Sequence, residues 1–178
     1  KIDTDTMELE KQKFDFTSLL SEAVEAFLPF AADKSIELKN LTPDSELVVN
    51  ADYNRMAQVL INLLSRAIKI SPANSQLSVR VKDAGDELTV EIQDEGQSLE
   101  RNEIHKITNH PDLMKEQFHA GQEDLILGLR IAKEFIEMHG GHIWAESSEA
   151  KQNIFCFTVP KSAVPQEDNM QVSSADAI

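Results

Sequence analysis

The chain has 178 residues, of which 41% are hydrophobic and 27% charged, enough apolar material for the core of one soluble domain. Lys and Arg number 17 against 31 Asp and Glu, a net charge of −14 that argues against binding nucleic acid or anionic membranes, because both need a basic surface. The single cysteine, Cys156, excludes an internal disulfide and a multi-cysteine metal site. No apolar run reaches the ~18 residues that span a bilayer and no signal-peptide pattern is present, so we expect a cytoplasmic segment, whose parent protein can be anchored elsewhere.

The first 13 residues, KIDTDTMELEKQK, are polar and predict a linker or the end of a preceding helical hairpin. An amphipathic helix is expected within the following FDFTSLLSEAVEAFLPFAADKS, with Thr17 or Ser18 as N-cap and Pro29 near its last turns. IELKNL then alternates apolar and polar residues, as a half-buried strand does. The apolar positions that recur at helical spacing are Leu19, Leu20, Ala23, Val24, Phe27 and Leu28.

The clearest helical pattern lies in VVNADYNRMAQVLINLLSRAIKISP, which predicts a short strand and then a helix of roughly 17 residues. Asp52 or Asn54 can cap the start of this helix, and Pro72 stops it. Its polar residues fall together on the side opposite the apolar stripe: Asn62, Arg66 and Lys69. The stripe itself consists of Met56, Val59, Leu60, Leu63, Leu64, Ala67 and Ile68.

Four more strands and one more helix are expected downstream. QLSVRV and ELTVEI alternate strictly and are joined by KDAGD, which predicts a hairpin. Residues 94–124 have weaker periodicity and predict a long loop, in which His105, His110 and His119 are expected as exposed residues rather than metal ligands. A helix that ends in a glycine cap is predicted in LILGLRIAKEFIEMHGG. Two strands are predicted in HIWAES and NIFCFTVP. We expect residues 162–178 to be disordered.

This order predicts one α+β domain over residues 14–161, a two-layer α/β sandwich whose mixed β-sheet is covered on one face by helices. The same strings, in the same order, resemble the ATP-binding domain of bacterial sensor histidine kinases, a member of the histidine kinase-like, or Bergerat-fold, ATPases. DYNRMAQVLINLLSRAIKISP is similar to the N-box helix of that domain, DEG to its first glycine box, and LGLRIAKEFIEMHGGHIWAES to its second glycine box and the following helix. The resemblance covers residues 11–161, and HGGHIWAES fits sensor kinases better than topoisomerase or chaperone ATPases.

The resemblance implies a nucleotide site, and five residues match its motifs. Asp94 matches the aspartate that accepts a hydrogen bond from the adenine amine, and Gly96 matches the glycine beside the base. Asn62 matches the first of two asparagines that hold Mg²⁺, and Lys69 matches the basic residue that reaches the phosphates. Gly128 is the surviving glycine of the second box, whose helix start offers N–H groups to phosphate.

Five other positions depart from the motifs. Arg66 replaces the second asparagine and has no lone pair for a metal, and Ile70 replaces the usual aromatic residue beside the base. Ser98, Asp124 and Ile126 replace glycines. Asp124 also brings negative charge to the phosphate position, where two unit charges ~4 Å apart repel by about 4 kcal/mol at an effective dielectric of about 20.

These departures predict a degenerate domain, or pseudokinase, with weak or no binding of Mg-ATP, no metal site and no phosphotransfer by itself, because the chain lacks the phosphoacceptor histidine on a preceding hairpin. Its expected partners are other two-component proteins, a partner kinase or a receiver domain; the parent is expected to dimerise through the hairpin and this segment to be monomeric. The alternative is a functional ATP-binding domain that phosphorylates a histidine on a separate domain. Arg66 has two corresponding interpretations: an exposed residue ion-paired with Asp94 or Glu95, or a cation that holds phosphate in place of Mg²⁺.

Overall fold

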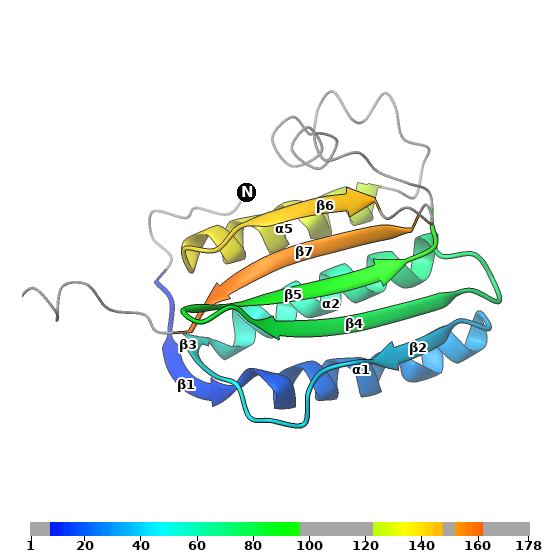
Figure 1. Cartoon of the computed structure of the whole chain (residues 1–178). Helices are drawn as coiled ribbons and strands as arrows, with labels where there is room; N and C mark the ends of the chain where they lie inside the picture. The colour runs from blue at the N-terminus through cyan, green and yellow to red at the C-terminus, as the bar shows by residue number, and fades with distance from the viewer. Residues whose placement is uncertain (1–7, 97–122, 148–151, 162–178) are drawn as a thin grey trace, which may run out of the picture.

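The computed structural model describes residues 8–96, 123–147 and 152–161 (Figure 1). Within them, a five-stranded mixed sheet carries three helices packed side by side on one face, which confirms the predicted two-layer α/β sandwich. The helices are α1 (Phe16–Asp33), α2 (Tyr53–Ile70) and α5 (Glu123–Met138). No helix among the described residues is both long and apolar enough to cross a membrane.

The five-stranded sheet has the strand order β2-β4-β5-β7-β6. β2 pairs parallel with β4, and the other neighbours pair antiparallel. The predicted hairpin between the two alternating segments is confirmed, and Gly85 in its turn has φ +97, a conformation that favours glycine. The strands are β2 (Glu37–Asn40), β4 (Gln76–Asp83), β5 (Glu87–Asp94), β6 (Ile143–Ser147) and β7 (Asn153–Pro160).

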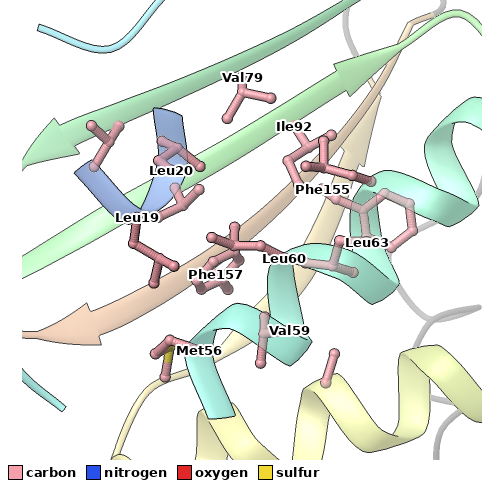
Figure 2. Close-up of a cluster of buried hydrophobic side chains, with 14 of the residues drawn as sticks. Leu19, Leu20, Met56, Val59, Leu60, Leu63, Val79, Ile92, Phe155 and Phe157 are labelled. Carbon is pink, nitrogen blue, oxygen red and sulfur yellow. The ribbon is translucent and has the colours of Figure 1, made fainter. Parts of the chain in front are cut away.

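The core lies between the sheet and the helices, where the alternating strand residues meet the apolar stripe of α2 (Figure 2). Leu63 packs there with Ile92 and Phe155, so α2 lies across the middle strands of the sheet. Fully burying a side chain of this size contributes roughly 1.5–3 kcal/mol, and this burial holds the polar face of α2 in one orientation. The core residues of α2 are Met56, Val59, Leu60, Leu63, Leu64, Ala67 and Ile68.

The N-terminal segment differs from the sequence prediction. Residues 11–13, predicted as part of a linker or helix end, belong to strand β1 (Lys11–Asp15), which pairs antiparallel with β3 (Val48–Asp52) in a separate two-stranded sheet. Helix α1 starts at Phe16, and its N-cap is Asp15 rather than Thr17 or Ser18, since the Asp15 carboxylate accepts from the Thr17 N–H at 3.1 Å. This strand could not be predicted from the sequence, because its residues are mostly polar and show no strand pattern. Its extended conformation depends on backbone pairing with β3.

The boundaries of α2 agree with the prediction. Asp52 is its N-cap, accepting from the Arg55 N–H at 3.1 Å, and the helix ends at Ile70, two residues before Pro72. The glycine end of α5 is also confirmed: Gly140 has φ +81, and a Cβ on Gly141 would clash with the Thr158 carbonyl oxygen. The predicted tail (residues 162–178), Ser98 and the three loop histidines lie outside the described residues.

Candidate functional site

Helix α2 places three site positions on one face, because Asn62, Arg66 and Ile70 follow one another at intervals of four residues. Each reaches a different element. Asn62 contacts α5, Arg66 lies over a ring of β7, and Ile70 packs beside Gly96 just after β5. The fold therefore brings Asn62, Arg66, Asp94, Gly96 and Gly128, predicted from separate motifs, to one end of the sheet.

Asn62 links the two helices that border the site. Its amide nitrogen donates to the Gly128 carbonyl oxygen at 3.0 Å, and its amide oxygen accepts from Gln58 Nε2 at 2.8 Å. The amide oxygen is the atom that would coordinate Mg²⁺, and one of its lone pairs is already engaged. Asn62 thus serves as a bridge between α2 and α5. A Cβ on Gly128 would be 3.6 Å from Asn62 Cβ, an ordinary contact that leaves the bridge intact.

Arg66 is buried, with 6% of its surface exposed, so the interpretation as an exposed, ion-paired residue is wrong. Its guanidinium lies 4.2 Å from the centroid of the Phe155 ring, a cation–π contact. Burial lowers the pKa of Arg66 to about 10, and the negative charge of Asp94 opposes that shift. Among the described residues Arg66 makes no direct ion pair, and Asp94 attracts it at longer range.

Asp94 ends β5 and is completely buried. Its Oδ1 accepts from the Gly96 N–H at 2.8 Å and from Asn153 Nδ2 at 3.1 Å. Its Oδ2 is buried and has no hydrogen-bond partner among the described residues. Burial raises the pKa of Asp94, while the two hydrogen bonds and Arg66 lower it. Among the described residues, Asp94 therefore has one buried, oriented acceptor atom without a partner, the kind of atom that an adenine amine would need.

Asn153 is a site residue that the sequence reasoning missed. It starts β7 and lies directly opposite Asp94 in the β5–β7 register. It is 1% exposed, and its amide orients the Asp94 carboxylate. The sequence gives no direct signal for this role, because Asn153 lies opposite Asp94 only when β5 and β7 pair in this register.

Gly96 is explained by the end of α2. A Cβ at this position would lie 2.9 Å from the Ile70 carbonyl oxygen and 3.0 Å from two atoms of the Ile70 side chain. A backbone oxygen cannot move away cheaply, so only glycine fits here. The Ile70 side chain fills the space over Gly96, and its predicted position beside the base, as a replacement for an aromatic residue, stays a prediction.

The last turn of α2 is held by a second residue that the sequence reasoning missed. Lys34 Nζ donates to the carbonyl oxygens of Ile68 and Lys69 at 2.9 and 2.7 Å. A positive charge at a helix C-terminus also interacts favourably with the helix dipole. The Lys69 side chain itself is exposed, so its predicted contact with phosphates remains a prediction.

The second glycine box forms the start of α5, whose backbone is helical from Glu123. The side chains of Asp124 and Ile126 lie outside the described part of the structure, as does Ser98, so their predicted effects stay predictions. No group of three or more His, Cys, Asp or Glu side chains gathers into a metal site within residues 8–96, 123–147 and 152–161.

Residues 51–163 match the family of histidine kinase-, DNA gyrase B- and HSP90-like ATPases. The chain belongs to this family. The match begins in β3 and ends just after β7, so it includes α2, α5 and every site residue described above except Lys34.

Known proteins similar to this ATPase domain include sensor kinases. The chain is 27% identical over 170 residues to sensor histidine kinase WalK of Bacillus subtilis (strain 168), covering 94% of the chain and 28% of WalK. It is 30% identical over 149 residues to adaptive-response sensory kinase SasA of Synechococcus sp. (strain CC9311), covering 84% of the chain and 39% of SasA. The chain thus spans well under half the length of either relative.

Solved structures agree with this assignment. The nucleotide-free catalytic domain of histidine kinase ThkA aligns with a TM-score of 0.73 and 28% identity, over 86% of this chain and 99% of that domain. ThkA in complex with the response regulator protein TrrA aligns with a TM-score of 0.71 and 28% identity, over 86% of this chain and 42% of that one. The predicted resemblance is confirmed: the chain carries the histidine kinase-like ATPase domain of a two-component sensor kinase.

Proposed function

We propose that this ATPase domain is degenerate: it binds Mg-ATP weakly or not at all, transfers no phosphate by itself, and acts in signalling through contacts with other proteins. The observation that carries the proposal is the position of Arg66. A buried cation stands on the helix face where the family motif has its second metal-binding asparagine.

The charge of Arg66 opposes a metal at this position. Mg²⁺ takes oxygen ligands, and a guanidinium carries only donors. A divalent ion ~4 Å from a unit positive charge would be repelled by about 8 kcal/mol at an effective dielectric of about 20. One lone pair of the other amide ligand, Asn62, is engaged by Gln58, which weakens the site further.

Signalling partners are proposed by analogy with the relatives. The ThkA structure holds a response regulator against its kinase, so a receiver domain is one candidate partner for this chain, and a partner kinase is the other. The parent protein is proposed to be a dimer and this segment a monomer. A domain whose fold and core are intact while its metal ligand is replaced supports a role in binding proteins rather than in chemistry.

A second candidate is a functional nucleotide-binding domain that phosphorylates a histidine on a separate domain. The unsatisfied Oδ2 of Asp94 favours it, because buried acceptors in proteins are nearly always paired and an adenine amine would supply the partner. Asp94, oriented by Asn153, would hold the base in this case, and the exposed Lys69 would reach the phosphates. The fixed charge of Arg66 would then offset phosphate charge without a metal.

Isothermal titration of the chain with ATP, in Mg²⁺ and separately in EDTA, distinguishes the two candidates. The degenerate domain gives no binding in the micromolar range in either buffer. Arg66→Asn, which recreates the pair of asparagines with Asn62, leaves Mg-ATP binding weak, since other motif residues also differ. Low-micromolar binding that requires Mg²⁺ contradicts the proposal.

The second candidate predicts different results from the same titrations. ATP would bind equally with and without Mg²⁺, Arg66→Asn would make the binding depend on Mg²⁺, and Asp94→Asn would abolish it. Asp94→Asn keeps the shape of the side chain but removes its charge and replaces one acceptor oxygen by a donor, so it tests the Asp94 carboxylate directly. Circular dichroism of each variant verifies that the domain remains folded.

A further inference from the structure

A buried histidine joins three elements at the end of the domain opposite Gly96. His139 directly follows α5 and is 6% exposed. Its Nε2 accepts from the Asp52 N–H at 2.9 Å, and its Nδ1 lies 2.7 Å from the Phe135 carbonyl oxygen. A backbone N–H can only donate and a carbonyl oxygen can only accept, so the ring is neutral with its proton on Nδ1.

Asp52, the partner of His139, also forms hydrogen bonds with two other segments. Its Oδ1 accepts from the Arg55 N–H at 3.1 Å as the N-cap of α2, and its Oδ2 accepts from the Glu10 N–H at 2.9 Å. The end of α5, the start of α2 and the backbone just before β1 therefore meet at one residue. Figure 1 shows the end of α5 at the same end of the domain as β1 and β3.

We propose that the His139–Asp52 hydrogen bond is a proton-sensitive joint, which releases the end of α5 from the start of α2 when His139 gains a proton. A protonated ring has donors on both nitrogens, so Nε2 would face the Asp52 N–H donor to donor and the bond would be lost. The contact of Nδ1 with the Phe135 carbonyl oxygen persists in both states, so only the link between the two helices responds.

The groups around His139 set the direction of this response. Burial lowers the pKa of His139 from 6.5, and the nearby charge of Lys11 on β1 lowers it too, whereas Asp52 and the Phe135 carbonyl oxygen raise it. Arg55 on α2 lies over the Phe135 ring at 5.0 Å and 4.0 Å from the Asp52 carboxylate. Because the folded pKa lies below the unfolded one, the joint is intact above about pH 6.5 and is lost as pH falls through the folded value.

The consequence for the site follows from where α2 and α5 remain attached. Among the described residues, a second hydrogen bond between these helices runs from Asn62 to the Gly128 carbonyl oxygen; it contains no titrating group and survives acid. Loss of the His139 link would loosen the end of α5 from the start of α2, where the Arg55–Phe135 contact remains, while the Asn62 end stays attached. Asp52 also accepts a hydrogen bond from the Glu10 N–H just before β1, so the His139–Asp52 bond connects both helices to the start of β1. A change at this bond can therefore be transmitted between β1 and the site. This inference holds whether or not the site binds nucleotide.

Nuclear magnetic resonance of the whole chain tests the joint directly. At about pH 8 the ¹⁵N shifts of His139 should report a neutral ring protonated on Nδ1. Lowering the pH stepwise until the ring shifts report a charged His139 should reduce hydrogen-exchange protection of the Asp52 amide at least about tenfold beyond the intrinsic pH effect, while amides in the middle of α2 keep theirs. This measurement needs no variant, so it does not depend on a substitution that fails to fold.

Two matched variants separate the joint from general acid effects. In His139→Gln the amide oxygen can accept from the Asp52 N–H without titrating, so the acid-induced loss of protection should disappear. His142→Gln removes an exposed histidine three residues away and should leave the loss unchanged. A ring protonated on Nε2 at about pH 8 would overturn the proposal, and so would a His139→Gln variant that still loses Asp52 protection in acid.

Discussion

Arg66→Met tests whether the buried guanidinium stabilises or destabilises the folded domain. Burial lowers the pKa of Arg66 to about 10 even though Asp94 attracts the charge. Each pKa unit corresponds to about 1.4 kcal/mol, so the charged form is disfavoured in the folded state by about 3 kcal/mol relative to water. Methionine has a similar reach and no charge, and it avoids this penalty.

Two effects reduce the gain from removing the charge. The substitution removes the cation–π contact with Phe155, which stabilises a desolvated site by about 2 kcal/mol. A contact between the methionine sulfur and the Phe155 ring restores about 1 kcal/mol of this stabilisation. Asp94 loses its nearby cation but can take up a proton, since burial already raises its pKa. We therefore expect Arg66→Met to be between neutral and about 2 kcal/mol more stable than the wild type at about pH 8.

Urea unfolding followed by circular dichroism measures the difference in unfolding free energy. Arg80→Met, at an exposed position on β4, is the control and should change stability by less than about 0.5 kcal/mol. Below about pH 10, Arg66 is charged in both the folded and the unfolded state, so the full cost of burying its charge lowers the stability of the wild type. Above about pH 10 the buried guanidinium loses its proton and this cost falls. The difference in unfolding free energy between Arg66→Met and the wild type should therefore shrink in strong alkali. A loss of 3 kcal/mol or more, roughly the cost of breaking a buried pair, would show that the guanidinium is a net stabiliser and would refute the reasoning.

Two further substitutions test the end of α2. Gly96→Ala should destabilise the domain by about 1–3 kcal/mol, because the new Cβ would meet the Ile70 carbonyl oxygen at 2.9 Å, and an equally stable Gly96→Ala in thermal unfolding would contradict this packing. Lys34→Met should cost about 1–3 kcal/mol in urea unfolding, since two charge-assisted hydrogen bonds to the last turn of α2 are removed. Lys13→Met, on the exposed side of β1, is the matched control for Lys34, and equal losses in both lysine variants would argue against a specific role.

The sequence predicted the main sheet and the helices that cover it. The apolar stripe of α2 repeats with helical period and the β4–β5 hairpin alternates strictly, and such patterns survive folding because each buries one continuous face. Motif order also singled out Asn62, Asp94, Gly96 and Gly128, which the fold brings together at one end of the sheet. It failed at β1, a polar strand whose extended form depends on pairing with β3.

The contacts of these residues could be read only from the packed structure. Arg66 looked exposed, because helical periodicity places it on the polar face, but that face turns toward Phe155 and the guanidinium is buried. Gly96 looked like a ligand glycine, and close packing of Ile70 now explains it. Asn153, Lys34 and His139 bond to residues 34 to 87 positions away along the chain. Periodicity and local motifs carry no information about such distant partners, since these meet only when the helices and strands pack.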